Sequence, residues 1–259
     1  MPIFDTHAHY YDAAFDPDRD DLLAALPERG VELVVCPGCD LASSQASIDL
    51  AARYDYLYAA AGIHPENLEG VTLEAVDQVK TLCAQDKVVA VGEIGLDYYW
   101  VRQPEQRAFS REMFDAQLSL SGELDLPAIV HDRDAHKDSL DLVRAHPNAR
   151  GVFHCCAVSL EDARVLLDRG WMLSFTGNIT FPKARRAIEI LQWMPLEALM
   201  LETDAPYMAP EPLRGHRCDS TMIPYMAEKV AQCRGDVTAQ QVLERTAENG
   251  KRFFRLEER

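Results

Sequence analysis

The sequence IFDTHAH at residues 3–9 places two histidines, His7 and His9, two positions apart at the end of a short apolar run. In a β-strand, side chains two residues apart point to the same face and lie about 7 Å apart along the strand. The two imidazoles are therefore expected to converge on one cation. A lone His-x-His pair is also compatible with a chance surface pair, so the rest of the chain decides between these interpretations.

This stretch is the first of eight short apolar runs that recur about every 20 to 40 residues. Between them, apolar residues follow helical spacing, as at Phe109, Met113 and Leu118. The runs cover residues 3–9, 31–36, 57–62, 88–92, 128–131, 151–154, 171–175 and 199–202. A strand and a helix repeated eight times predict an α/β fold, a (β/α)8 TIM barrel with a parallel sheet. No linker or repeat interrupts the pattern, so we expect a single domain over residues 1–259.

The composition is that of an ordinary globular protein, with 26% charged and 47% hydrophobic residues. No apolar run approaches the roughly 20 residues that span a bilayer, and the first residues lack the pattern of a signal peptide. The seven cysteines are an odd number, which argues against a disulfide framework. We therefore expect a soluble, cytoplasmic protein with no membrane partner and no obligate protein partner.

The formal net charge of -16 argues against binding along duplex nucleic acid, which normally requires a basic face. An acidic chain can still act on a phosphate ester where bound cations supply positive charge locally. The charge therefore favours a substrate that is engaged at its end through few phosphates.

Metal-binding side chains gather where the predicted strands end. The set consists of His7, His9, His64, Glu93, His131, His154 and Asp204. The carboxyl ends of barrel strands form one rim, and active sites of barrel enzymes lie there. Imidazole and carboxylate suit divalent ions such as Zn, Mn or Mg, and a carboxylate can bridge two of them. Without His64, for which a structural role is an equal alternative, the set still has enough donors for two divalent metal ions.

Six motifs occur in order along the chain. They are DTHAH at 5–9, GIHP at 62–65, GEIGLDYY at 92–99, PAIVHDRDA at 127–135, FHC at 153–155 and ETDAPY at 202–207. With them the chain resembles the TatD-type metal-dependent deoxyribonucleases of the amidohydrolase superfamily over nearly its whole length. The resemblance implies a barrel with one or two divalent metals that hydrolyses phosphodiester bonds, often from DNA 3′ ends.

The resemblance also implies roles for individual residues. His7 and His9 would hold the first metal, and His131 and His154 the second. Glu93 would bridge the two metals, and Asp204 would act at the first metal and as proton acceptor, so that Glu93 and Asp204 are the expected catalytic residues.

The chain departs from the family pattern after the eighth predicted strand. Members often have Arg-Asn-Glu-Pro there, whereas this chain has Arg217, Cys218, Asp219 and Ser220. Cys156 stands where Phe is common. Neither change removes an expected metal ligand, but loops beyond the strands shape what fits over the metals, so the substrate stays open.

Two candidate substrate contacts lie close to the expected ligands. His64 is expected to contact the phosphate or a leaving oxygen, with a structural role as the alternative. Arg133 is a candidate fork for a phosphate oxygen, and a surface salt bridge with Asp132 or Asp134 is the equal alternative.

Other candidates lie further out. Tyr98 and Trp100, in the run YYW at 98–100, offer faces for stacking an unpaired base, with core packing as the rival for Trp100. Asn178, together with Thr180 and Lys183, is expected to face the substrate, although an ordinary loop leading into a helix near Pro182 is slightly favoured. Glu202 is expected to orient a histidine rather than to bind a metal.

Cys36 and Cys39 form the run CPGC, which invites a redox or zinc interpretation. No second cysteine pair of matching spacing accompanies it. A strand end followed by a turn at Pro37 and Gly38 is the favoured interpretation.

The sequence therefore predicts a divalent-metal-dependent phosphodiesterase, in particular a 3′-5′ exonuclease acting on single-stranded DNA ends, with a small phosphodiester or nucleotide as the other substrate it allows. One alternative keeps the metals but changes the bond, to an amide, a lactone or an aminoacyl ester. A second is a metal-binding interaction protein without catalysis.

Overall fold

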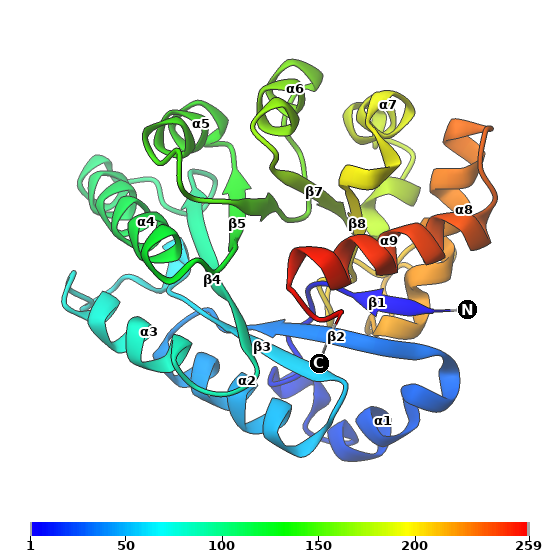
Figure 1. The fold of residues 1–259 in the computed structure, drawn as a ribbon, viewed down its shortest axis with the longest axis horizontal. Coiled ribbons are helices and arrows are strands. Elements are labelled where there is room, and N and C mark those ends of the chain that lie inside the picture. Colours follow the sequence, from blue (N-terminus) through cyan, green and yellow to red (C-terminus); the bar gives the residue numbers. More distant parts are fainter. Residues whose placement is uncertain (1, 258–259) are drawn as a thin grey trace.

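The computed structural model describes residues 2–257 of the chain. Within them, eight parallel strands form one sheet in chain order, and nine α-helices pack on it (Figure 1). The strands are β1 (Ile3–Asp5), β2 (Val31–Pro37), β3 (Leu57–Ala61), β4 (Val88–Asp97), β5 (Ala128–Arg133), β6 (Gly151–Phe153), β7 (Met172–Phe175) and β8 (Leu199–Leu201). The helices are α1 (Arg19–Ala25), α2 (Leu41–Arg53), α3 (Ala75–Cys83), α4 (Pro104–Leu124), α5 (His136–Ala145), α6 (Leu160–Asp168), α7 (Arg185–Trp193), α8 (Ile223–Arg234) and α9 (Ala239–Phe253).

The first and last strands meet and bring the sheet close to a full barrel. The backbone N–H of Thr6 donates to the carbonyl of Leu201 at 3.3 Å, and that of His9 donates to the carbonyl of Ala205 at 2.7 Å. Ala8 and Ala205 form an isolated parallel bridge just beyond the two strands. The predicted (β/α)8 barrel is therefore confirmed, with all eight apolar runs forming strands.

Strand ends differ from the predicted ones at three positions that matter for the site. β1 ends at Asp5, so His7 and His9 lie in the irregular segment that crosses to β8 rather than on a strand. β4 and β5 instead run further than their apolar runs, to Asp97 and Arg133, so that Glu93 lies within β4 rather than just beyond it. His131 continues the β4–β5 pairing opposite Gly95, whereas Glu93 lies where that register shifts, and its backbone N–H donates to the carbonyl of Gly38 at 2.8 Å.

The buried apolar residues form two clusters, one inside the barrel and one between the barrel and the surrounding helices. The smaller cluster takes one or two residues from each strand, including Phe4, Val35 and Ile129, and none from helices α1–α8, so it fills the barrel interior. Phe253 and Phe254 at the end of α9 join this cluster and cover one mouth of the barrel (Figure 1). The other cluster lies between the strands and the surrounding helices. With one mouth covered, the opposite one is left for the histidines.

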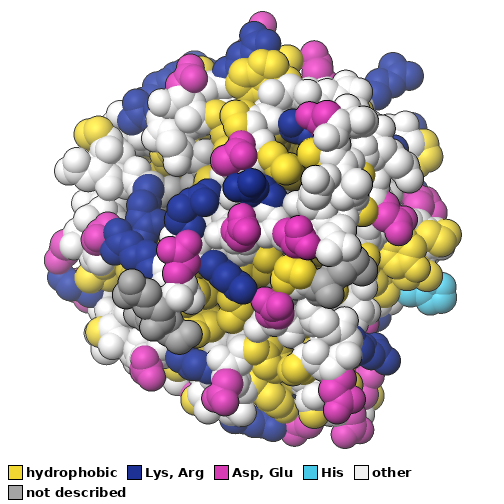
Figure 2. All heavy atoms as spheres, turned by 45° about the vertical axis from the view of Figure 1, so that its right-hand side comes forward, with side chains coloured by type: hydrophobic (Ala, Val, Ile, Leu, Met, Phe, Trp, Pro, Cys, Tyr) yellow, Lys and Arg dark blue, Asp and Glu magenta, His cyan; other side chains and the backbone are white. Residues whose placement is uncertain are grey.

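In the view of Figure 2, several Lys and Arg side chains gather to the left of the centre with Asp and Glu side chains around them, and histidine contributes very little of this face. Among the helices of residues 2–257, none combines the length and the apolar character needed to cross a membrane.

Candidate metal centre

Glu93 lies at the centre of the histidine cluster, and its two carboxylate oxygens face different donor groups. Its Oε2 lies 3.4 Å from Nε2 of His7 and 3.6 Å from Nε2 of His9. Oδ1 of Asp204 lies 3.3 Å from the same His9 nitrogen and 3.7 Å from Nε2 of His7. These four residues make up what we call the first donor group.

Three histidines face the other oxygen of Glu93. Its Oε1 lies 2.8 Å from Nε2 of His154, 3.1 Å from Nδ1 of His131 and 3.3 Å from Nε2 of His64. We call these three histidines, with Oε1 of Glu93, the second donor group. The structure thus brings all six predicted metal ligands together and adds His64, which the sequence suggested as a substrate contact.

Hydrogen bonds to the outer ring nitrogens turn the inner nitrogens toward the centre. Nδ1 of His9 lies 3.1 Å from the carbonyl of Pro37, and Nε2 of His131 lies 3.0 Å from Oδ2 of Asp97. Partners of this kind fix the tautomer and orientation of metal-binding histidines.

Glu202 occupies the position expected of an orienting carboxylate. Its Oε1 lies 3.4 Å from Nδ1 of His154 and accepts the backbone N–H of Cys155, while its Oε2 accepts the hydroxyl of Ser174. Glu202 therefore sits behind His154, on the side away from Glu93.

The electrostatics of the cluster favour bound positive charge. Burial alone would raise the pKa of Glu93, but His154, His64 and His7 lower it well below its usual value. Burial disfavours charged His154, yet the facing carboxylates Glu93 and Glu202 raise its pKa well above the ordinary value. Glu93 thus stays ionised, and its buried negative charge favours a cation beside it.

The donor set itself fits divalent metal better than protons. Nε2 of His7 and Nε2 of His9 face each other at 3.0 Å in a buried site, and at most one of them can carry the proton between them. A divalent ion would use both lone pairs at once, and Asp204 and Glu93 would neutralise its charge. His7, His9 and Asp204 offer donor atoms within 4.8 Å of one another, and so do His64, Glu93 and His131.

Trp100 and Arg133 lie at the edge of this mouth, and the structure decides between their alternatives. Trp100 is 56% exposed and Tyr99 is 41% exposed, so core packing is wrong for Trp100. The guanidinium of Arg133 stacks 4.0 Å from the centroid of the Tyr99 ring. Among residues 2–257 it forms no ion pair with Asp132 or Asp134, so the salt-bridge alternative is also wrong.

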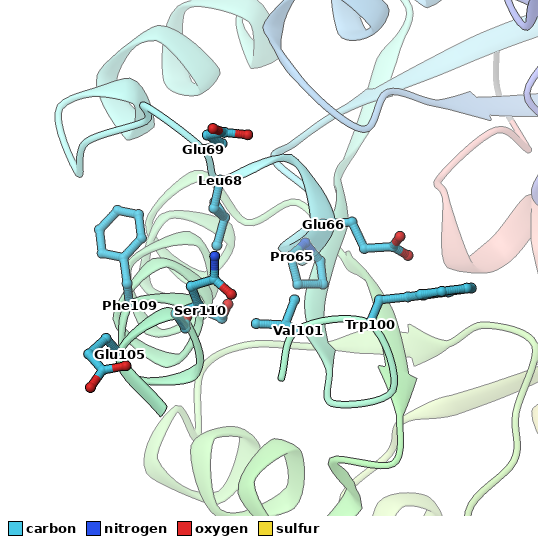
Figure 3. Close-up of a pocket in the computed structure, with 10 residues that line it drawn as sticks. Pro65, Glu66, Leu68, Glu69, Trp100, Val101, Glu105, Phe109 and Ser110 are labelled. Carbon is cyan, nitrogen blue, oxygen red and sulfur yellow. Dashed lines mark hydrogen bonds between the residues drawn. The ribbon is translucent and has the colours of Figure 1, made fainter. Parts of the chain in front are cut away.

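Figure 3 shows the cavity beside Trp100, which has a volume of about 540 Å³. The side chains of Trp100 and Glu66 point the same way, while Glu105 and Phe109 lie on the opposite side of the cavity. The cavity is lined by Pro65 and Glu66, which directly follow His64 of the second donor group in the chain.

The other two residues predicted to contact the substrate, Tyr98 and Asn178, form hydrogen bonds within the protein. The hydroxyl of Tyr98 donates to Oδ2 of Asp138 at 2.6 Å. Nδ2 of Asn178 donates to Sγ of Cys155 at 3.4 Å, and its buried Oδ1 has no hydrogen-bond partner. Asn178 lines a cavity of about 480 Å³, but the following helix begins at Arg185 rather than near Pro182. A short 3-10 turn at Gly177–Thr180 takes up the intervening chain.

The segment that departs from the family pattern supports the barrel from outside the two donor groups. Arg217 pairs with Asp18 through both guanidinium nitrogens, at 2.6 and 2.7 Å. The hydroxyl of Ser220 donates to Oδ2 of Asp5 at 2.6 Å and lies 2.7 Å from the hydroxyl of Tyr10. These contacts tie the segment to the chain on either side of His7 and His9.

Sequence reasoning missed three residues beside the metal donors. Asp97 orients His131, Cys39 lies 3.6 Å from Oε2 of Glu93, and the hydroxyl of Tyr11 lies 3.1 Å from Nδ1 of His9. Asp97 stood four residues after Glu93 in the quoted motif. Cys39 ended the CPGC run, whose strand end the structure confirms, although Pro37 is still part of β2 and the chain bends at Cys39 and Asp40 rather than at Pro37 and Gly38.

The model of a protein family described as TatD related DNase matches residues 4–255. The chain belongs to this family. The metal-dependent hydrolase YabD of Bacillus subtilis (strain 168), named as uncharacterized, is 35% identical over 256 residues, which cover 98% of this chain and 99% of YabD. This chain is therefore a metal-dependent hydrolase of the TatD family.

Two further relatives come from other bacteria. The protein named 3′-5′ ssDNA/RNA exonuclease TatD from Erwinia tasmaniensis (strain DSM 17950 / CFBP 7177 / CIP 109463 / NCPPB 4357 / Et1/99) is 32% identical over 265 residues, covering 98% of this chain and all of that protein (100%). A crystal structure of YJJV, a TatD homolog from Escherichia coli K12, superposes with a TM-score of 0.88 at 28% identity and covers 98% of each chain.

Proposed function

We propose that this TatD-family hydrolase is a two-metal phosphodiesterase that works as a 3′-5′ exonuclease on single-stranded DNA ends. The observation that carries the proposal is the placement of Glu93, whose two oxygens face two separate donor groups. The relative from Erwinia tasmaniensis carries the same activity in its name. In this proposal the first donor group would hold one ion of Mg, Mn or Zn and the second group would hold another, with Glu93 shared between the two groups.

The two ions would supply Lewis-acid stabilisation of the phosphate and a lowered pKa for the attacking water. Asp204 is the donor best placed to take the proton of that water, because its side chain is 15% exposed while that of Glu93 is 3% exposed. Burial raises the pKa of Asp204, but His9 and His7 lower it below its usual value, so the carboxylate is ionised near neutral pH. Asp204 therefore acts as general base and Glu93 holds the two donor groups together.

The mouth of the barrel offers contacts for an unpaired nucleotide. Trp100 and Tyr99 present exposed rings, which stack on a base only when that base is not paired. The guanidinium of Arg133, which stacks on the Tyr99 ring, can donate two hydrogen bonds to a phosphate group. His64, Tyr98 and Asn178 remain proposed substrate contacts.

Hydrolysis of a single-stranded DNA oligonucleotide, labelled at its 3′ or its 5′ end, tests the proposal directly. Metal-stripped protein is resupplied with Mg, Mn or Zn, and products are resolved by length. We expect metal-restored shortening from the 3′ end, together with loss of cleavage in Glu93→Gln and in Asp204→Asn. Glu69→Gln, which removes a carboxylate from the cavity of Figure 3, is the matched control and should keep full activity.

Two results would contradict the proposal. Full activity in both Glu93→Gln and Asp204→Asn would mean that another site cleaves the DNA. An absence of cleavage with all three metals, by protein that binds them, would shift the assignment to an amide, lactone or aminoacyl-ester hydrolase.

A further inference from the structure

A cysteine thiol lies against the first donor group. Sγ of Cys39 is 3.6 Å from Oε2 of Glu93, the oxygen that also faces His7 and His9. His9, Cys39 and Glu93 each offer a donor atom within 4.8 Å of the other two. Two of these three residues are already expected metal ligands, so the sulfur is a further donor at a site that the other residues form.

The backbone of Cys39 is held in place on both sides. Its N–H donates to Oγ of Ser43 at 2.9 Å, and its carbonyl accepts the N–H of His64 at 2.9 Å and Nδ2 of Asn67 at 3.0 Å. Asp40 caps the following helix α2, so the chain beyond Cys39 is fixed as well. The sulfur can therefore turn toward the donors only by rotating about one side-chain bond.

Tyr11 adds a hydrogen bond that suits a metal-bound sulfur. Its hydroxyl donates to Sγ of Cys39 at 3.2 Å and lies 3.1 Å from Nδ1 of His9. A sulfur that already accepts a hydrogen bond has one lone pair engaged and a further one available. Such outer partners orient metal ligands and tune their basicity.

The spacing of the donor atoms of Cys39, His9 and Glu93 fits three neighbouring ligands of one zinc ion. With bonds of about 2.3 Å to sulfur and about 2.0 Å to nitrogen and oxygen, donors on one zinc ion lie about 3.3 to 3.6 Å apart. Sγ of Cys39 to Oε2 of Glu93 and Nε2 of His9 to the same oxygen are each 3.6 Å apart. Magnesium prefers oxygen donors, whereas thiolate favours zinc and cobalt.

We propose that Cys39 is a further ligand of the first metal site and makes that site selective for thiolate-binding ions such as Zn²⁺ over Mg²⁺. The inference rests on the metal centre of the proposed function but not on DNA cleavage. The other cysteine at this mouth, Cys155, contacts Thr176 and Asn178 with its sulfur and provides the matched control.

Cobalt spectroscopy of the full chain tests the assignment without a substrate. Metal-free protein is titrated with Co²⁺, and the near-ultraviolet thiolate-to-cobalt charge-transfer band is recorded. We expect the band in the wild type and in Cys155→Ser and its loss in Cys39→Ser. Far-ultraviolet circular dichroism verifies that both variants are folded.

Competition with a chromophoric zinc chelator gives a second readout. We expect Zn²⁺ binding to weaken about 10- to 100-fold in Cys39→Ser, with Mg²⁺ affinity changed less than about threefold. Cobalt binding without the band, a band that survives in Cys39→Ser, or unchanged Zn²⁺ affinity in that variant would each overturn the inference. Wild type that shows the band but leaves DNA intact would refute the nuclease proposal alone.

Discussion

At the scale of single residues, the site depends on side chains that never reach the substrate. Asp97 accepts from Nε2 of His131 with one oxygen and from the backbone N–H of Trp100 with the other. An amide offers only one accepting oxygen, so it cannot satisfy both donors. Asp97 thus couples the second donor group to the exposed aromatic residues beside it.

Asp97→Asn is therefore expected to loosen His131. Metal affinity or activity should fall about 10- to 100-fold, the usual effect of removing such a partner, while the fold persists. Metal content after dialysis and oligonucleotide hydrolysis measure the two effects. Asp138→Asn, which removes the carboxylate facing Tyr98, is the control, and equal losses in both variants would argue against a specific role for Asp97.

Ser220 illustrates a residue that serves stability. Its hydroxyl connects Asp5 and Tyr10 in a fully buried cluster. Ser220→Ala leaves both without this partner, so the free energy of unfolding should fall by about 1–3 kcal/mol. Urea denaturation measures this loss, with Thr221→Ala as the neighbouring control. An unchanged unfolding midpoint would show that Asp5 needs no donor from this segment.

At the scale of elements, the apolar runs predicted the barrel because each strand is buried on both faces and reads as a continuous apolar segment. Strand-end histidines were predictable for the same reason, since the barrel brings all carboxyl ends to one rim. Cys39 and Asp97 were not predictable in their roles. The contacts of Cys39 and Asp97 depend on the register of β2 and β4 with their neighbouring strands. The spacing of apolar residues does not predict that register.

The close packing of β4 on β5 leaves no room for a side chain at Gly95. Gly95 has a φ of +139°, and a Cβ there would lie 2.0 Å from the carbonyl oxygen of His131. Gly95→Ala must therefore push β5 away or distort β4. We expect it to destabilise the fold by about 3 kcal/mol or more and to displace His131 from the second donor group.

Thermal unfolding and metal stoichiometry together measure this effect. Gly122→Ala is the matched control, because a Cβ on that face of α4 would meet no atom closer than 3.8 Å. In a helix interior this change should stabilise by about 0.5–1 kcal/mol. If Gly95→Ala unfolded and bound metal like the wild type, the close packing of β4 on β5 would have no bearing on the site.

At the scale of the whole molecule, the net charge of -16 sets how a polyanion approaches the barrel. Glu66, Glu69 and Glu105 line the cavity beside Trp100, whereas Lys183, Arg185 and Arg186 line the cavity beside Asn178. The bound DNA strand should therefore run from the metal centre toward the cavity that follows β7, where the local charge is positive. Only a few phosphates can be neutralised there.

This charge distribution predicts a preference for single strands and a weak salt dependence. Cleavage of a single-stranded oligonucleotide should exceed that of the matched blunt duplex by about tenfold or more, since melting an end costs a few kcal/mol that the acidic surface does not repay. The logarithm of kcat/KM should fall with the logarithm of salt concentration with a slope of about -1 to -2, the value for one to three phosphates. A slope near -6, or equal rates on both substrates, would mean that a long tract of duplex is bound.

Lys183→Gln locates the contact. It should make the slope of log kcat/KM against log salt concentration shallower by about 0.7 to 1, the change for one lost phosphate contact on a single strand. It should also weaken binding uniformly across sequences. Lys137→Gln, at an 85% exposed side chain on α5, changes the net charge equally and should leave the slope unchanged. If both variants shifted the slope alike, the overall charge of the molecule would govern substrate approach, and the strand would follow no path over β7.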